Sequence, residues 1–484
     1  SVTGKLPAAT ETVAVAIIGG AGDGAHAGTV GITDSRVDIT GRLFGRPFEA
    51  RARVTGLGEP NPAVEGHLSG EFGLSQLNDF REGEPLPVEG SASVSLDFGG
   101  PAKSVDRWNV SGPVRLANVV WTTESLPHPV RIASATVMLT GTGVRAEGVP
   151  VAIGGSDLSV SFSSPQLVRH YLTETAARGP APPIEFTARS SRLAAEDLRR
   201  GPNDVGYADL LKARFAGREV AGRPPEAIAS ERYRRPDLSS IRARGAVSIG
   251  EWVNPPTSAS DVSFQVDVAD GLVEISQVAG TVYDGRLSGD ASIDLRAEPP
   301  YELAYDLELR GAGAGSLLER WTRLGRALSG VVDFEIEGSA PLDEAFLPIT
   351  SAFTATGNAS FVEGRFEELG LFQALRTHLD LGPERLRGFR DLGGPFAIRE
   401  GQFVVQNWTF TAGDIQGAVS GGAGLAGALN LDLAFLLPPE LLRNTPVADA
   451  NETIERLIAQ IGGAEGAAGD GEAAPIPLRM RVGG

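Results

Sequence analysis

Residues 301–309 are the clearest indication of the fold class. Their sequence is Tyr301-Glu-Leu-Ala-Tyr-Asp-Leu-Glu-Leu309. Every second residue of this stretch is apolar, and acidic residues occupy three of the four positions between. Successive side chains of a β-strand point to opposite faces of the sheet, so the apolar residues share one face and the acidic residues the other. The stretch therefore predicts a strand of an antiparallel sheet that has one buried face and one hydrated face.

The same two-residue period recurs along the chain. It appears in residues 92–98, 158–162, 262–268 and 429–435. Short turn signals separate such runs, and they predict hairpins that join neighbouring strands. The clearest signals are Asp270-Gly271, Asp284-Gly285, Glu363-Gly364 and Glu400-Gly401.

Glycine is unusually frequent, at 62 of 484 residues, against about 7 per cent in an average protein. The dipeptides Ser69-Gly70 and Ser288-Gly289 lie inside predicted strands. Glycine inside a strand is typical of bulges and bends, which let a sheet coil. We therefore expect a mainly β protein, with an elongated, strongly curved antiparallel sheet in the form of a β-groove. This sheet is expected to be built of repeats and to carry a few short amphipathic helices.

Some segments have apolar residues at the spacing of a helix instead. Residues 316–328, 365–379 and 451–461 are predicted to be short amphipathic helices, and a further helix is expected at 207–215. Together with proline-rich stretches, these segments divide the chain into four parts. The parts are a repeated N-terminal β region at 1–180, a Pro- and Arg-rich boundary or insertion at 181–240, a middle β repeat at 241–340, and a C-terminal β region at 341–484.

The charge balance excludes one class of partner. The formal net charge is −18 at pH 7, from 43 Lys and Arg against 61 Asp and Glu. Such a balance disfavours nonspecific binding to the phosphate backbone of nucleic acids or to an anionic bilayer surface. We therefore expect no nucleic-acid partner. No run of about 18 apolar residues occurs, so no helix of this chain is expected to cross a membrane.

The residue types needed for site chemistry are scarce. Cysteine is absent, which excludes disulfides, thiolate zinc sites and cysteine nucleophiles. The five histidines do not fall at metal-ligand spacing. Acidic pairs are plentiful, but they lie on the hydrated side of predicted strands, where solvation accounts for them. We therefore expect no metal, no cofactor and no enzymatic activity.

Two glycine-rich motifs have a structural explanation. Gly422-Ala-Gly-Leu-Ala-Gly427 matches the dinucleotide fingerprint by spacing, but an alternating strand follows it where that fingerprint requires a helix. We interpret it as a hairpin loop. Gly311-Ala-Gly-Ala-Gly315 precedes a predicted helix but lacks the lysine of a P-loop. We interpret it as a lead-in to the helix, with Ser316 as the N-cap.

A sheet of this length must hide its apolar face. It can do so by packing on a second sheet, or by forming a trough whose lining contacts another apolar molecule. The second arrangement implies a ligand of the size of a lipid. Both arrangements use the same strands, so the two-residue period is compatible with either.

The C-terminal third resembles the AsmA-like family of bacterial envelope proteins. The resemblance lies in Phe353-Thr-Ala-Thr-Gly-Asn-Ala-Ser-Phe-Val-Glu-Gly-Arg-Phe366, in Gly394-Pro-Phe-Ala-Ile-Arg-Glu-Gly-Gln-Phe403 and in the closing strand Ile476-Pro-Leu-Arg-Met480. Upstream, Val282-Tyr-Asp-Gly-Arg-Leu-Ser-Gly289 is similar to a hairpin motif of the same family. These motifs are glycine and alternation patterns, and no catalytic residues carry over with them.

The resemblance implies a protein of Gram-negative bacteria that lies in the periplasm and is held in the inner membrane by an N-terminal helix. We expect no such helix within the residues of this chain, so the anchor is what the resemblance implies. Family members have a β-groove implicated in moving phospholipid toward the outer membrane and in outer-membrane biogenesis. The implied partner is thus a phospholipid or another acyl-chain lipid, with envelope proteins as further partners.

Three functions remain open at this point. The first is a non-enzymatic conduit in which acyl chains lie along the alternating apolar residues. The second is a structural or assembly module that docks envelope proteins by pairing strands at a sheet edge, and the third and weakest is a hydrolase on a β scaffold. For the first, the candidate lining residues, each of which has ordinary sandwich core as its alternative, are Val262, Phe264, Val266, Ala291, Ile293, Leu303, Tyr305, Leu307, Val332, Phe334, Leu431 and Leu433.

Overall fold

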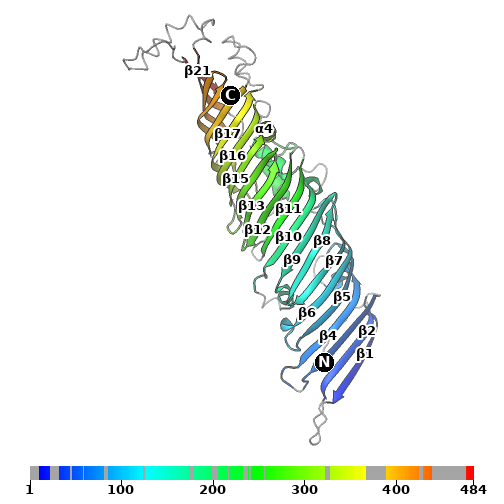
Figure 1. The fold of residues 1–484 in the computed structure, drawn as a ribbon. Coiled ribbons are helices and arrows are strands. Elements are labelled where there is room, and N and C mark those ends of the chain that lie inside the picture. The colour runs from blue at the N-terminus through cyan, green and yellow to red at the C-terminus, as the bar shows by residue number, and fades with distance from the viewer. Residues whose placement is uncertain are drawn as a thin grey trace. The chain divides into compact units, whose positions relative to one another are not determined.

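The protein is mainly β, with a mostly antiparallel sheet and few short helices (Figure 1). The prediction of a mainly β protein with an antiparallel sheet and a few short helices is thus confirmed. The computed structural model describes residues 10–21, 32–43, 46–57, 59–80, 85–123, 126–173, 179–198, 205–215, 217–232, 238, 241–254, 257–321, 328–366, 388–424, 429–438 and 476–483.

The chain divides into two compact units. Unit 1 comprises Ser1–Asp204, Pro236–Asn254 and Ser260–Ile275. Unit 2 comprises Val205–Arg235, Pro255–Ala259 and Ser276–Gly484. The four-part division expected from composition stays a prediction, as does the expectation of internal repeats.

In unit 1 each strand from β1 to β9 pairs antiparallel with the next strand along the chain. The pair β10–β11 is parallel, and its connection contains two helices that belong to unit 2. The strands are β1 (Thr10–Ala21), β2 (Ile32–Leu43), β3 (Arg46–Thr55), β4 (Ala63–Gly73), β5 (Val88–Pro101), β6 (Asn109–Trp121), β7 (Val130–Gly141), β8 (Gly143–Ile153), β9 (Ser156–Ser164), β10 (Ile184–Ala194) and β11 (Arg242–Asn254).

In unit 2 each strand from β14 to β22 pairs antiparallel with the next. These strands are β14 (Gly285–Asp294), β15 (Tyr301–Gly313), β16 (Leu328–Leu342), β17 (Thr354–Phe366), β18 (Gly388–Arg399), β19 (Gln402–Ala412), β20 (Ile415–Gly424), β21 (Leu429–Leu437) and β22 (Ile476–Gly483). Two further strands, β12 (Thr257–Ala269) and β13 (Leu272–Val282), each have residues in both units.

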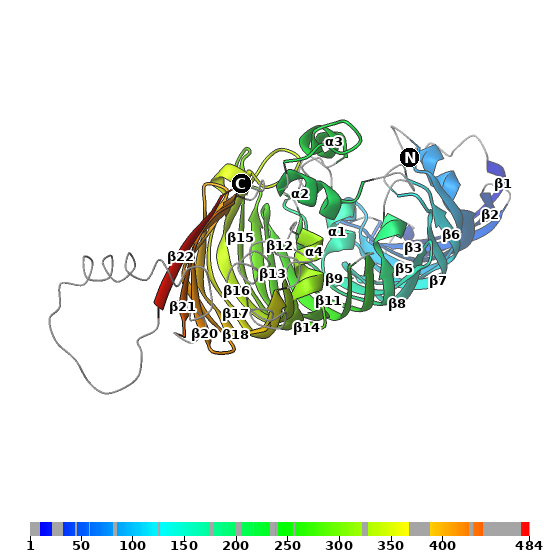
Figure 2. The same cartoon turned by 90° about the horizontal axis from the view of Figure 1, so that it is seen from above.

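The helices are short and lie beside the strands. Helix α4 packs against β15 and β16 in unit 2 (Figure 2). Helices α2 and α3 pack on each other, and with Ala345 and Leu347 they form a small buried cluster. The helices are η1 (Leu74–Phe80), η2 (Val105–Arg107), α1 (Leu167–Leu172), η4 (Ala195–Leu198), α2 (Tyr207–Phe215), α3 (Pro225–Arg232), α4 (Ala314–Trp321) and η5 (Thr350–Ala352).

The helix predictions have mixed outcomes. The helix expected at 207–215 is confirmed as α2. The helix expected at 316–328 is α4, which begins at Ala314, while Leu328 already belongs to β16. At the start of the helix expected at 365–379, Arg365 and Phe366 are the last residues of β17. The remainder of that segment and the segment 451–461 lie outside the described residues.

Three of the four predicted turns join strands. Asp270-Gly271 and Glu400-Gly401 lie between consecutive strands, Asp284 lies directly before Gly285, the first residue of β14, and the three non-glycine residues have positive φ. Glu363-Gly364 was predicted wrongly, because it lies inside β17. There Gly364 is opposite Gly330 of β16 and Phe389 of β18. The aromatic ring beside Gly364 accounts for this glycine better than a turn does.

Many glycines inside the strands accommodate an aromatic ring, and they do not give the sheet the strong curvature that was expected. The sheet is not strongly curled, so the prediction of strong curvature is wrong. At Ser69-Gly70 and Ser288-Gly289 the strand register runs on without a shift, so neither dipeptide is a bulge. Many in-strand glycines instead leave room for a carbonyl or an aromatic ring of the next strand. The packing of an aromatic ring over a glycine is known as aromatic rescue. The directly opposed pairs are Gly66 with Phe98, Gly245 with Phe186, Gly357 with Phe396, Gly364 with Phe389, and Gly417 with Phe410.

The change Gly364→Ala should destabilise unit 2 by about 1–3 kcal/mol, the usual cost of overpacking. A methyl group at this position would overlap the carbonyl oxygen of Ser329 and the ring of Phe389. Gly179→Ala is the control, because a Cβ there would contact nothing within 4 Å. Denaturant titrations measure both. Equal stability of the two variants would contradict this role for the glycine.

Candidate functional site

The strand register of unit 1 places apolar residues and glycines in a line across the strands. Each strand from β3 to β11 contributes one directly opposed position to this line, which we call the apolar row of unit 1. Directly opposed residues of neighbouring strands share a face of the sheet. The row consists of Phe48, Gly70, Val94, Val114, Val137, Ala146, Phe162, Phe186 and Gly245.

The apolar row of unit 1 is only half-buried. Ala146 is the one member that is buried, at 2% exposure. Fully buried apolar side chains are few among the described residues of unit 1, and they are Leu74, Ala92, Val119, Val144, Ala146, Val149, Ala194 and Ile249. A contiguous apolar surface that stays partly exposed across so many strands is typical of a binding surface.

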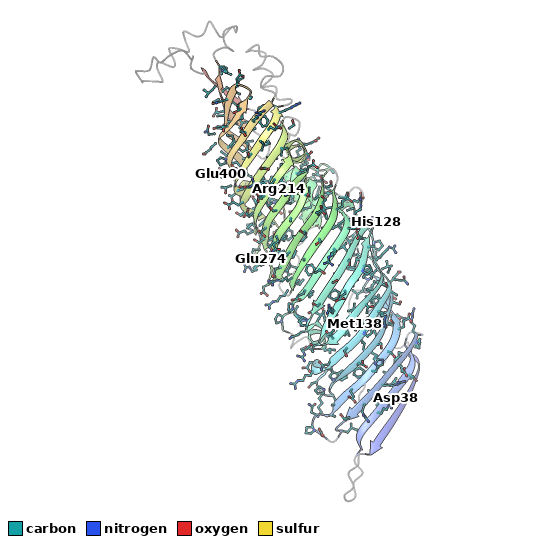
Figure 3. All side chains as sticks on the ribbon, viewed as in Figure 1. Asp38, His128, Met138, Arg214, Glu274 and Glu400 are labelled. Atoms are coloured by element: carbon teal, nitrogen blue, oxygen red, sulfur yellow. The ribbon has the colours of Figure 1, made fainter. Side chains whose placement is uncertain are left out.

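The opposite face of unit 1 is polar and ion-paired. Met138, labelled in Figure 3, is on this face, next to Val137 of the row, and is 40% exposed. Arginines on the strands pair with nearby carboxylates, as in Arg145 with Glu147 and Arg192 with Glu251. Exposed ion pairs of this kind add little stability, but they keep that face hydrated. The sheet of unit 1 is therefore amphipathic.

Unit 2 has a corresponding row of directly opposed residues from β14 to β21. Its members are Gly289, Leu307, Ile336, Gly357, Phe396, Val405, Gly421 and Leu431. Phe396 and Val405 are buried here, at 4% and 5% exposure. The difference from unit 1 comes from the aromatic residues that surround this row.

Aromatic rings of unit 2 fill the space over its own apolar face. The ring centroids of Phe366 and Phe389 lie 4.5 Å apart, and those of Phe334 and Phe396 lie 5.1 Å apart in a stacked arrangement. These rings belong to two buried clusters that span β15 to β21. Leu317 of α4 packs against the larger cluster. This part of unit 2 is thus an ordinary hydrophobic core.

The predicted lining residues divide between the two environments. Val262, Phe264 and Val266 lie on β12 within unit 1 and are half-buried. In unit 2, Val332 and Leu433 are buried in the core at 2% and 5% exposure, and Phe334 packs against that core. The half-buried members of unit 2 are Ala291, Ile293, Leu303, Tyr305, Leu307 and Leu431.

The register brings part of this predicted set together. Tyr305 is opposite Ala291, and Leu303 is opposite Ile293. Sequence reasoning did not select the residues of the apolar row of unit 1, although 92–98 and 158–162 had the same alternation. The missing signal was the pairing register, because only the register aligns residues of separate strands in one line.

Tyr305 carries a polar group on the apolar side of β15. Its hydroxyl is buried and has no hydrogen-bond partner among the described residues. Burial raises the pKa of Tyr305 to about 12, so the phenol stays neutral at physiological pH. The ring stacks on Phe353 at 6.0 Å between centroids. Tyr305 therefore contributes an aromatic ring to the apolar side of β15 and a neutral hydroxyl that could donate a hydrogen bond.

One polar cluster has the residue types of a catalytic triad. His67 Nδ1 lies 2.8 Å from Asp97 Oδ1, and Ser95 Oγ lies 3.5 Å from His67 Nε2. All three side chains project from the polar face of β4 and β5, whose backbones pair with strands on both sides. Acyl transfer needs free N–H donors for the oxyanion and a cleft for the substrate. A paired, exposed strand surface provides neither, so this cluster supports no catalytic assignment.

Asp157 is a carboxylate of unit 1 that we expect to make the stability of this unit depend on acidic pH. Its carboxylate accepts hydrogen bonds from the Arg192 N–H at 2.9 Å and from the hydroxyl of Ser191 at 2.8 Å. These bonds, first of all the one from the Arg192 N–H, lower the pKa of Asp157 below its usual value of 3.8. A lowered folded-state pKa stabilises the fold above the unfolded pKa, and that contribution disappears as the pH falls through the folded pKa.

The difference in free energy of unfolding between the native protein and Asp157→Asn should therefore be largest above pH 4 or so and shrink below it. Urea titrations at a series of pH values measure this difference. A difference that does not change with pH would contradict the assignment. The variant Glu185→Gln is the control, since Glu185 is an exposed carboxylate on β10 without these donors.

Comparisons complete the description of the site. Searches of protein-family models, curated proteins and solved structures give no match to this chain. In the described ranges, no three His, Asp or Glu side chains are placed to hold a metal ion. The described helices are all too short or too polar to cross a membrane. The apolar face and the residues next to it are therefore the features of this protein from which a function can be inferred.

Proposed function

We propose that the protein is a non-enzymatic lipid carrier of the bacterial envelope, whose apolar sheet face holds the acyl chains of phospholipids. In this proposal it lies in the periplasm, is anchored in the inner membrane, and moves phospholipid toward the outer membrane during outer-membrane biogenesis. The observation that carries the proposal is the half-buried apolar row of unit 1.

The hydrophobic effect would favour the binding of an acyl chain to this face. Each methylene group that leaves water for an apolar surface contributes about 0.8 kcal/mol. An acyl chain placed along the apolar row of unit 1 would cover side chains such as Val114, Val137 and Phe162, which are partly exposed without it. Both the lipid and the protein lose contact with water, so the two surfaces are complementary.

Unit 2 contributes less to this function. Its clusters of Phe361, Phe389 and Phe410 already bury its apolar face. An acyl chain would have to displace these rings, and disrupting a packed core costs several kcal/mol. The half-buried residues around Leu303 and Tyr305 are the part of unit 2 that could still contact a lipid.

The sequence motifs support the same proposal. The resemblance to the AsmA-like family rests on residues 353–366 and 394–403, which form β17 and the β18–β19 hairpin of unit 2. Membership of that family is part of the proposal. It would account for the envelope location and for an N-terminal anchor.

The test is direct. The protein is purified from the periplasm of a Gram-negative host without detergent and extracted with organic solvent, and the extract is analysed for phospholipid by mass spectrometry. We expect about stoichiometric or greater phospholipid, and exchange of fluorescent lipid between vesicles. An extract free of lipid, together with no exchange, would refute the proposal.

One observation favours a second candidate function, docking of envelope proteins by strand addition. Strand β1 (Thr10–Ala21) pairs with β2, and no second strand pairing of β1 is found among the described strands of unit 1. The strand has no proline and one charged residue, Glu11. Such an edge can accept another strand. Crosslinking from β1 in cells that captures a protein but never lipid would favour this alternative.

A further inference from the structure

One end of the unit 1 sheet has a rim made by two short helices. Helix η2 lies in the connection between β5 and β6, and α1 follows β9. The two helices contact each other, and α1 also packs on β8. The Arg169 N–H donates to the carbonyl of Thr142, which ties α1 to the turn between β7 and β8. We call residues 101–108 and 165–173 the η2–α1 rim.

The apolar face of unit 1 extends to this rim. Trp108 stacks on Phe98 with a centroid distance of 5.4 Å and an angle of 7°. Phe98 belongs to the apolar face, where it is opposite Gly66 and Val110. At the rim itself Val105 is 47% exposed and Tyr171 is 66% exposed. An acyl chain on the face therefore has apolar contacts up to the edge of the sheet.

Three cations lie at the same rim. Lys103, Arg107 and Arg169 are exposed, and no described carboxylate forms an ion pair with them. Lys103 Nζ donates to the carbonyl of Pro60 at 2.8 Å, which is a neutral acceptor. Asp106 on η2 is the one carboxylate within the sequence of the rim, so the rim residues carry three cations against one anion, while Glu59 and Glu174 lie outside the rim.

This local excess contrasts with the rest of the molecule. The whole chain has a net charge of −18. Many strand arginines are neutralised by a carboxylate, as Arg244 is by Asp267 and Arg242 by Asp270. A guanidinium with no carboxylate partner retains its donors for an external anion, and phosphate is the anion that matches its geometry best.

We propose that the η2–α1 rim binds the phosphate of a lipid whose acyl chains lie on the apolar face of unit 1. The inference rests on the proposed function as a phospholipid carrier and adds to it the site that recognises the phosphate, which would favour a phosphate-bearing lipid over a neutral lipid with the same chains. Lys103, Arg107 and Arg169 supply the charge-assisted hydrogen bonds, and Trp108 and Phe98 support the first part of the acyl chain. Because the cations are exposed, the preference weakens as the salt concentration rises.

The test compares phosphatidylglycerol with diacylglycerol of identical chains. The variant Lys103→Gln/Arg107→Gln/Arg169→Gln removes the rim charges. The control Arg53→Gln/Arg115→Gln/Arg131→Gln removes three exposed cations from the strands of the same unit. The ratio of the two lipids bound to each purified full chain is measured by mass spectrometry after incubation with mixed vesicles. We expect the rim variant to lower this ratio by about tenfold, and the control variant to leave it within about twofold of the native protein.

The outcomes separate this inference from the function on which it rests. Native protein that binds neither lipid refutes the lipid-carrying function itself. Native protein that binds both lipids with no preference, or a rim variant that keeps the native ratio, refutes only the phosphate site. In the last experiment inorganic phosphate is added as a competitor. We expect inorganic phosphate not to displace phosphatidylglycerol, because inorganic phosphate has no acyl chain that could bind the apolar face. Displacement by inorganic phosphate would identify a free-anion site and overturn the lipid assignment.

Discussion

Replacing Val137 with glutamate should reduce the lipid bound per protein by about tenfold or more. Val137 lies in the middle of the apolar row of unit 1, directly opposite Val114 on one side and Ala146 on the other. A carboxylate at this position would have to leave water when an acyl chain covers it, and burying an unpaired charge costs several kcal/mol. The fold should survive because the site is half-exposed in the lipid-free protein.

The matched control is Thr136→Glu. Thr136 is the preceding residue on β7, and its exposed side chain lies on the polar face of the sheet. The control adds the same charge to the same strand, so it should keep the lipid content of the native protein. Lipid per protein is measured by mass spectrometry, and folding by circular dichroism. Equal lipid content in Val137→Glu and Thr136→Glu would exclude this face as the acyl-chain site.

Truncation of Phe389 to alanine should lower the free energy of unfolding of unit 2 by about 3–5 kcal/mol. Phe389 is 2% exposed and contacts Phe366 and Phe361, with centroid distances of 4.5 Å and 6.2 Å. Removing the ring leaves a cavity that the surrounding strands cannot close. Denaturant titration followed by tryptophan fluorescence measures the loss. Val362→Ala is the control, since this residue of β17 is 58% exposed and should change stability by less than about 0.5 kcal/mol.

The same Phe389→Ala variant also tests whether the acyl chains bind to the apolar face of unit 1 or to that of unit 2. Under conditions where it remains folded, it should bind as much lipid as the native protein, because the apolar row of unit 1 is unchanged. A loss of lipid as large as that of Val137→Glu would mean that the acyl chains depend on the apolar face of unit 2. The two variants therefore locate the lipid as well as detect it.

Much of the secondary structure was predictable from local patterns. The alternating stretch 301–309 lies in β15, and the helix expected at 207–215 is α2. In both cases the pattern is complete within one element, so neighbours in the sequence carry the signal. The Asp270-Gly271 turn is a similar case, since positive φ at both residues is a local property.

The failures occur where distant residues decide the structure. Phe366 had helical spacing, yet it ends β17 and packs against Phe389 and Phe410 from other strands. Gly364 had the sequence of a turn, yet it provides room for a ring from β18. The expected strong curvature was wrong for the same reason. A glycine that accommodates a neighbouring ring looks, in the sequence, the same as a glycine that bends a strand.

The sequence predicts which face of the sheet a residue of the candidate site lies on, but not how deeply that residue is buried. Alternation identified apolar residues on one face, among them Val262, Leu303 and Val332. It could not separate Val332, which is buried at 2% exposure, from Leu303, which is half-buried. Burial depends on which rings pack over a residue, and those rings come from strands far away in the sequence.

The alternation of residues is enough to identify an amphipathic, mainly β chain, because a two-residue period assigns each side chain to one face from its immediate neighbours alone, and the composition offers little of the chemistry of a catalytic site. Which part of the apolar face is covered depends on packing between strands that are distant in the sequence. The strands of both units have the same alternation, but Phe361, Phe389 and Phe410 converge over the face of unit 2. In unit 1 the pairing register aligns small and aliphatic residues into a row that stays half-exposed. That difference arises from packing between strands, and it is the physical basis for placing the lipid on unit 1.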